Sequence, residues 1–231
     1  MTFLMGPRTA LQSGPHCRTM QNAPVLVGHR PVVHLATNSV VGWRLGRTRV
    51  PSDPEGRREH LRRAVLQMAQ TLLDTDRGHL SMRFAVIEAT IAEAADLVEP
   101  IEDAIGQFGF PGARFGIVFS GDEVAANPDE HEHLRRLVAM GVGVTLDAPD
   151  PSGAFEVLRL GLPIIRLRLR LPLDDGLVTP ATAQQSAAIV DLARRQGMRT
   201  SITAIDTPVQ ESMARWAGAD VGTGDQLGPV S

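Results

Sequence analysis

Short apolar stretches and segments of helical periodicity alternate along most of this chain. Residues 25–35 and 40–50 are two β-branched stretches separated by only four residues, a spacing that predicts an antiparallel hairpin. Asp53 and Pro54 then predict the start of a helix, because a capping carboxylate followed by proline is a typical first turn. One apolar stripe of this helix is expected at Leu61, Val65, Met68 and Leu72.

After this helix the pattern alternates between strand and helix. Strands are expected near residues 80–86, 115–119, 142–146, 164–169, 199–205 and 220–222. Helices are expected near residues 92–108, 128–140, 153–160, 181–196 and 208–216. Counted with the hairpin, the strands number eight, which favours a closed TIM-like (β/α)8 barrel over an open doubly wound sheet.

Composition places one domain of barrel size in this chain. The 231 residues are 43% apolar and 21% charged, which is enough for one core of that size but not for two. Residues 1–23 contain two Gly-Pro steps and no periodicity, so we expect a flexible tail there. The barrel is expected to occupy residues 24–231.

Charge and cysteine content exclude several classes of function. A net charge of −3 gives no general attraction to nucleic acid, and no apolar run approaches a membrane span. Cys17 is the only cysteine, and the first twenty residues lack a signal-peptide pattern, so we expect a cytoplasmic protein without an internal disulfide. All 23 basic residues are arginine, which excludes chemistry that depends on lysine.

The most unusual local pattern is an alternation of arginine with aliphatic residues in the expected strand near 164–169. Because side chains of a strand alternate between its faces, Arg166, Arg168 and Arg170 all point to one side. The outer helices of a barrel pack on the aliphatic side, so the arginines are expected inside the barrel. Two interpretations stay open there: an internal salt-bridge network, or a site for a phosphate-bearing anion.

Segments 31–37, 40–43, 141–147 and 192–207 resemble, in order and spacing, the conserved segments of EAL domains, the cyclic di-GMP phosphodiesterases. The resemblance runs from about residue 29 to 229 and implies an EAL-type barrel whose first strand is antiparallel. It also implies a hydrolase with two metal ions, which needs several carboxylates to balance the metal charge. Most positions that correspond to the family's functional residues hold others here: Arg44, Thr48, Arg83, Val118, Gly121, Ala148, Arg168, Arg170, Thr203 and Thr223.

Asp147 is the one carboxylate that stays at its expected position. It lies at the end of one strand, and Arg168 lies at the corresponding end of the next, which favours a salt bridge between them over a metal contact. Glu88 and Asp206 are further expected partners of the interior arginines. Arginines at positions 44 and 83, where the resemblance places metals, oppose metal binding, because like charges about 4 Å apart repel by about 4 kcal/mol at intermediate dielectric. We also expect Trp43 and Trp216 to be core or helix-packing residues.

These departures predict an inactive relative of the phosphodiesterases, with no catalytic residue, metal or cofactor. We expect a binding or adaptor protein of bacterial signalling, which contacts a regulatory protein and does not bind membranes or nucleic acid directly; a homodimer stays open. The alternative is a metal-independent receptor for cyclic di-GMP or another phosphate-bearing ligand. Its binding residues are expected to be Arg44, Arg83, Arg168, Arg170 and Asp147.

Overall fold

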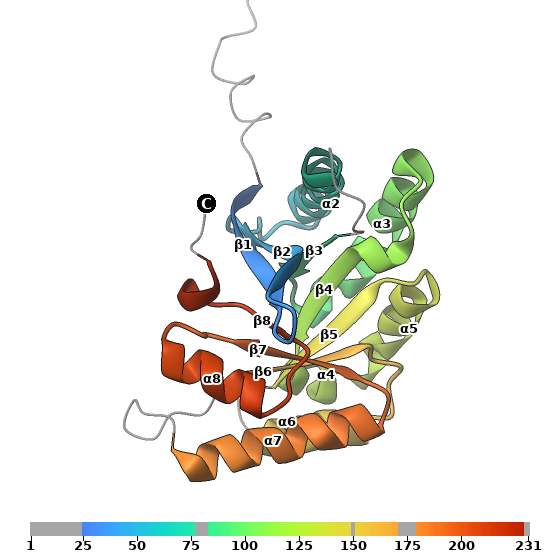
Figure 1. Cartoon of the computed structure of the whole chain (residues 1–231). Coiled ribbons are helices and arrows are strands. Elements are labelled where there is room, and N and C mark those ends of the chain that lie inside the picture. The colour runs from blue at the N-terminus through green and yellow to red at the C-terminus, as the bar shows by residue number, and fades with distance from the viewer. Residues whose placement is uncertain (1–24, 77–82, 149–150, 171–178, 229–231) are drawn as a thin grey trace, which may run out of the picture.

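Eight strands close a barrel in the computed structural model, which describes residues 25–76, 83–148, 151–170 and 179–228 (Figure 1). The predicted tail lies outside the described residues. The strands are β1 (Leu26–His34), β2 (Ser39–Arg47), β3 (Phe84–Glu88), β4 (Phe115–Ser120), β5 (Gly143–Ala148), β6 (Arg166–Arg170), β7 (Arg199–Thr203) and β8 (Val221–Gly222). Neighbours in sequence are neighbours in the barrel, and β8 pairs with β1.

β1 is antiparallel to both of its neighbours, while β2 to β8 are parallel to one another. The carboxyl ends of seven strands therefore meet at one rim of the barrel, which we call the mouth. The amino-terminal end of β1 lies at the same rim, because Leu26 pairs with Arg47. The predicted antiparallel hairpin and the eight-stranded TIM-like barrel are confirmed.

Helices surround the strands (Figure 1). They are α2 (Pro54–Asp76), α3 (Ala94–Phe108), α4 (Gly121–Ala126), α5 (His131–Ala139), α6 (Pro151–Arg159), α7 (Pro180–Arg195) and α8 (Pro208–Trp216). Four short 3-10 turns also occur: Ile91–Glu93, Gly112–Arg114, Pro128–Glu130 and Asp225–Leu227. No helix among the described residues is long and apolar enough to cross a membrane.

The core lies between the strands and the helices. On the outer face of the barrel, the side chains of Phe115, Ile117 and Phe119 of β4 are fully buried. Leu167 and Leu169 of β6 are no more than 3% exposed on the same face. The alternation of side chains turns Arg166 and Arg168 inward, where they line a small cavity of the barrel. The predicted orientation of the arginine strand is confirmed for these two residues.

The observed bounds of β3, β6 and β7 differ from the pattern in the sequence. β3 begins at Phe84 and ends at Glu88, two residues beyond the expected end. β6 begins at Arg166 instead of 164, and β7 ends at Thr203 instead of 205, because Ala204 takes a left-handed backbone conformation with φ 59° that no strand continues through. The helix Gly121–Ala126 was not predicted; the hydroxyl of Ser120 caps it by accepting a hydrogen bond from the backbone N–H of Glu123.

Candidate binding site at the barrel mouth

Four charged side chains from four strands meet at the mouth. Arg168 of β6 donates from Nε to Asp147 Oδ1 at 2.7 Å and from Nη1 to Glu88 Oε1 at 2.6 Å. Arg44 of β2 donates from Nη2 to the same oxygen of Glu88. We call Arg44, Glu88, Asp147 and Arg168 the mouth network; it links β2, β3, β5 and β6 across the rim.

Strand register brings these side chains together. Asp147 and Arg168 are paired residues of adjacent parallel strands, so their side chains leave the sheet on the same side and at the same height. Glu88 is the last residue of β3. Arg44 lies on the neighbouring strand β2, two residues before the β2 position that is opposite Glu88. The guanidinium of Arg168 is planar and carries donors on two edges, which allows it to hold two carboxylates at once.

Burial differs across the mouth network. The side chain of Arg168 is 11% exposed, that of Asp147 30%, that of Arg44 33% and that of Glu88 49%. Burial lowers the pKa of Arg168, but its hydrogen bonds and charge contacts with Asp147 and Glu88 outweigh burial and raise it. Burial raises the pKa of Glu88, but Arg168 and Arg44 outweigh it and hold that pKa below its ordinary value. Glu88 and Arg168 are therefore both charged at neutral pH.

The mouth network does not fit a two-metal centre. Its two carboxylates already accept hydrogen bonds from two guanidinium groups, so the four formal charges sum to zero. Within the described ranges, no three His, Cys, Asp or Glu side chains are arranged to hold a metal ion. Divalent cations such as Mg²⁺ need several free oxygen ligands. The arrangement instead provides a charged, internally paired closure of the barrel.

The predicted salt bridge between Asp147 and Arg168 is confirmed, and Glu88 is confirmed as a partner of the interior arginines. The expectation for Asp206 is wrong: its Oδ1 accepts the backbone N–H of Asp225 at 2.9 Å. Asp225 in turn pairs with Arg30 at 2.8 Å, so a second ion pair closes the mouth beside β1.

Arg83 was assigned to the mouth, and that assignment is wrong. It immediately precedes β3 and so lies at the opposite end of the barrel from Glu88. Its Nη1 donates to the carbonyl of Thr75 at 3.5 Å, and its own carbonyl accepts from Arg114 Nε. The family resemblance placed Arg83 after this strand, whereas β3 begins only at Phe84; the mouth position belongs to Glu88.

Arg170 ends β6 and is exposed at the mouth. It makes no hydrogen bond or ion pair with any residue in the described part of the chain, so it is the predicted site residue with the greatest freedom to contact a ligand.

Trp216 also departs from expectation: it is 60% exposed rather than packed between helices. Trp43, by contrast, packs against the core as expected.

A groove lies beside the mouth, and the sequence did not predict it. It has a volume of about 320 Å³ and is lined by Val27, Gly28, His29, Arg30, Arg44 and Gly46 of the hairpin. The side chain of His29 meets the ring of Trp43 edge-on, with ring centroids 5.1 Å apart. Two guanidinium groups therefore border open space next to the mouth network.

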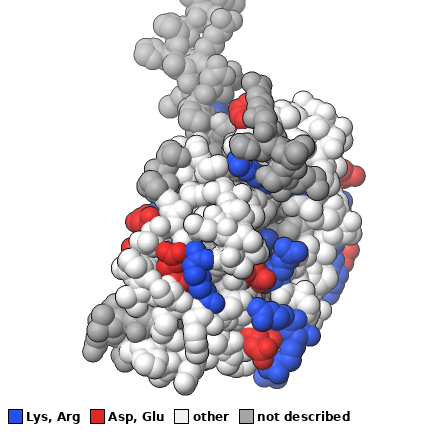
Figure 2. Space-filling model, viewed as in Figure 1, with Lys and Arg blue, Asp and Glu red and all other residues white. Residues whose placement is uncertain are grey.

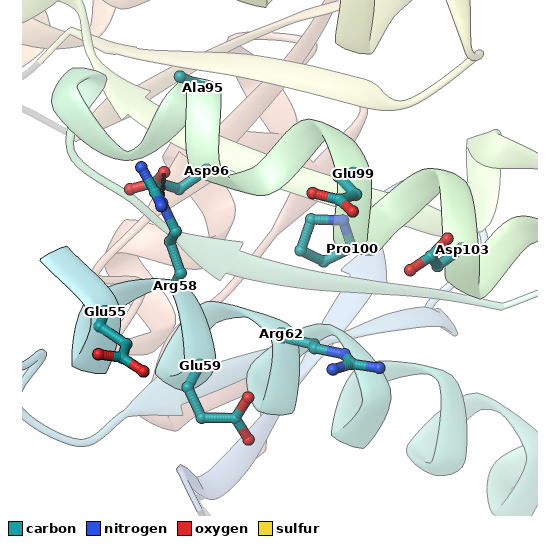
Figure 3. A pocket seen from close by; sticks show the side chains of 9 residues that line it. All are labelled: Glu55, Arg58, Glu59, Arg62, Ala95, Asp96, Glu99, Pro100 and Asp103. Carbon is teal, nitrogen blue, oxygen red and sulfur yellow. Dashed lines mark hydrogen bonds and ion pairs between the residues drawn. The ribbon is translucent and has the colours of Figure 1, made fainter.

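A larger cavity lies elsewhere, between α2 and α3, with a volume of about 650 Å³ (Figure 3). Figure 3 shows carboxylates of both helices and guanidinium groups of α2 around this space, including Glu59, Arg62 and Asp103. Asp96 accepts hydrogen bonds from Arg57 at 2.8 Å and from Arg58 at 3.1 Å. Charges of both signs are also interleaved on the face in Figure 2, without an extended patch of one sign.

No family model and no curated protein matches the chain. Solved structures do match: the EAL domain of FimX from Xanthomonas citri, in complex with c-diGMP, shares 16% identity at a TM-score of 0.71, covering 93% of this chain and 92% of that one. The chain has the EAL-domain fold. Two further solved structures agree. The EAL domain of DcpA from Mycobacterium smegmatis shares 19% identity at a TM-score of 0.72, covering 89% of this chain and 92% of that one. An EAL-domain protein from Listeria monocytogenes shares 14% identity at a TM-score of 0.70, covering 96% of this chain and 95% of that one.

We predict that Arg168 and Asp147 stabilise this EAL fold as a coupled pair. Arg168→Ala leaves two carboxylates without their shared donor, and Asp147→Ala removes one acceptor from a largely buried guanidinium, so each should lower the free energy of unfolding. The double variant should lose less than the sum, with a coupling of about 0.5–3 kcal/mol. Urea unfolding of the parent and the three variants measures this.

Glu132 and Arg135 of α5 provide a matched control pair, since their side chains are 69% and 55% exposed. Their double-mutant cycle should give a coupling of no more than about 0.5 kcal/mol. Strict additivity at Arg168 and Asp147, or equal coupling in both cycles, would contradict a stabilising role for the mouth network.

Proposed function

We propose that this EAL-fold domain is catalytically inactive and acts in bacterial signalling by binding, principally through protein contacts. The observation that carries the proposal is the position of Arg168, which donates to both carboxylates of the mouth network. A pair of divalent cations would need those same oxygens.

The energetics of the mouth support inactivity. A metal ion could enter only by breaking hydrogen bonds to charged groups, each of which stabilises the folded state by about 1.5–3 kcal/mol. It would then lie near Arg44 and Arg168, and repulsion at about 4 Å costs about 4 kcal/mol for each unit of metal charge at intermediate dielectric. Both terms act against a metal-activated water at this position.

An exposed apolar face on α8 supports function through protein contacts. Val209 and Trp216 are each 60% exposed and lie seven residues apart, which places them on the same face of the helix. Tryptophan is enriched among the residues that dominate binding energy at protein interfaces. The face is available for a partner within the described part of the molecule.

We predict that the purified protein does not hydrolyse cyclic di-GMP with Mg²⁺ or Mn²⁺. Restoring a single acidic side chain, as in Arg44→Glu, should not produce turnover either, because metal ligands act as a unit. Chromatography of the nucleotide products tests this, with an active EAL phosphodiesterase as the positive control. Turnover by the parent that Asp147→Ala abolishes would contradict the proposal.

The hairpin groove favours a second candidate function, a metal-independent receptor for a phosphate-bearing ligand. Its volume of about 320 Å³ is within the usual range of about 300–1,000 Å³ for ligand pockets, and Arg30 and Arg44 supply forked donors. The solved FimX domain of the same fold is in complex with c-diGMP. Exposed Arg170 provides a further cation at the mouth.

If the domain is such a receptor, titration calorimetry should detect heat when cyclic di-GMP is added to the protein in the presence of a metal chelator. The affinity should fall as salt concentration rises, because phosphate contacts are screened. Arg44→Ala and Arg170→Ala should weaken binding, whereas Arg135→Ala on α5 should not. The absence of heat at high protein concentration would remove cyclic di-GMP as the ligand.

A further inference from the structure

A small cavity lies inside the barrel, next to the mouth network. Its volume of about 30 Å³ exceeds the roughly 10–15 Å³ needed for one water molecule and is far too small for a nucleotide. Apolar walls come from Val32, Val86 and Val118. The polar side is formed by hydroxyl groups and by the inward-pointing arginines of β2 and β6.

Three buried polar atoms that line this cavity lack a hydrogen-bond partner among the described residues. They are Arg166 Nε and the hydroxyl oxygens of Thr145 and Thr223. Thr145 is 2% exposed and Thr223 3%, so bulk solvent does not satisfy these hydroxyls. Buried polar groups of native proteins are usually paired, and three unpaired groups around one cavity indicate a bound species that accepts hydrogen bonds.

The local charge is positive. Arg44, Arg166 and Arg168 line the cavity, and the two carboxylates of the mouth network already pair with the first and third of these. Arg166 lies over the ring of Phe84, with its guanidinium carbon 4.8 Å from the ring centroid. One positive charge, that of Arg166, is therefore left without a bonded carboxylate from any residue that the structure describes.

Asp220, immediately before β8, acts on Arg166 through its charge but makes no hydrogen bond or ion pair with it in the described structure. Asp220 Oδ2 accepts hydrogen bonds from the backbone N–H and the hydroxyl of Thr200, at 2.7 and 3.0 Å. Burial and the neighbouring charge of Arg199 lower the pKa of Arg166, against the opposite effect of Asp220. Since arginine stays protonated in proteins, the cost of burying this charge has to be offset by an anion or by solvent.

We propose that the cavity binds one monatomic anion, chloride or another halide, with Arg166 as its counter-charge and the hydroxyls of Thr145 and Thr223 as further donors. A halide accepts hydrogen bonds from all three groups and balances one positive charge, which a water molecule does not. The anion site is separate from both candidate functions of the mouth, because neither a nucleotide nor a protein side chain reaches it through a cavity of this size.

The site is tested with crystals of the full chain grown in sodium bromide. Anomalous diffraction at the bromine edge should show one peak in the cavity beside Arg166. Melting temperature should also rise with bromide or chloride, by about 2–4 °C at a few times the dissociation constant and in proportion to the logarithm of concentration above that, relative to sodium gluconate at equal ionic strength.

Variants separate this site from a general salt effect. Arg166→Met should abolish the halide dependence, whereas Arg170→Met on the same strand should retain it. If Arg166→Met does not fold, Thr145→Val provides the test: it should shift the half-saturating halide concentration upward by threefold or more. No bromine peak in the cavity, or a halide dependence that is equal in the parent and these site variants, would overturn the proposal.

Discussion

The pairing of one buried guanidinium with two carboxylates organises the mouth of this barrel. Arg168 is the most buried member of the mouth network, and its charge is tolerated there because Asp147 and Glu88 both accept its hydrogen bonds. The three residues come from β6, β5 and β3, so the interaction fixes the relative positions of nonadjacent strands. Removing any one member of the mouth network leaves its formal charges unbalanced by one unit.

This constraint connects the stability of the fold to its chemistry. Carboxylates that neutralise arginines are not available to divalent cations, and the guanidinium groups themselves repel such cations. The same pairing leaves Arg166, one layer deeper, without a carboxylate partner among the described residues, next to two buried hydroxyl groups that also lack a partner there. The proposed binding function then depends on the hairpin groove, which Arg44 of the mouth network also lines, on exposed Arg170 and on the apolar face of α8.

Sequence patterns predicted the architecture well because they reflect local physics. The four-residue connection between β-branched stretches specified the hairpin, and the alternation of arginine and leucine specified which face of β6 points inward. The salt bridge between Asp147 and Arg168 followed from their matching positions at the ends of adjacent parallel strands. Each of these predictions depends on short-range spacing and on a general rule of barrel geometry.

The wrong predictions depend on tertiary context. Arg83 was misplaced because the apolar pattern before Phe84 does not show where β3 pairs with its neighbours, and a shift of a few residues moves a side chain to the other end of the barrel. Asp206 could not be assigned without its partner Asp225, nineteen positions later in the chain. Trp216 is exposed because no element packs on that face of α8, which a helical pattern alone does not reveal.

The central claim is that paired charges at the mouth replace a metal centre, and Mn²⁺ binding tests it most directly. The electron paramagnetic resonance signal of free Mn²⁺ should be unchanged when this protein is added in stoichiometric excess at neutral pH. An active EAL phosphodiesterase provides the control in which the signal falls. Loss of the free signal with two Mn²⁺ bound per chain, reversed by Asp147→Asn, would contradict the account.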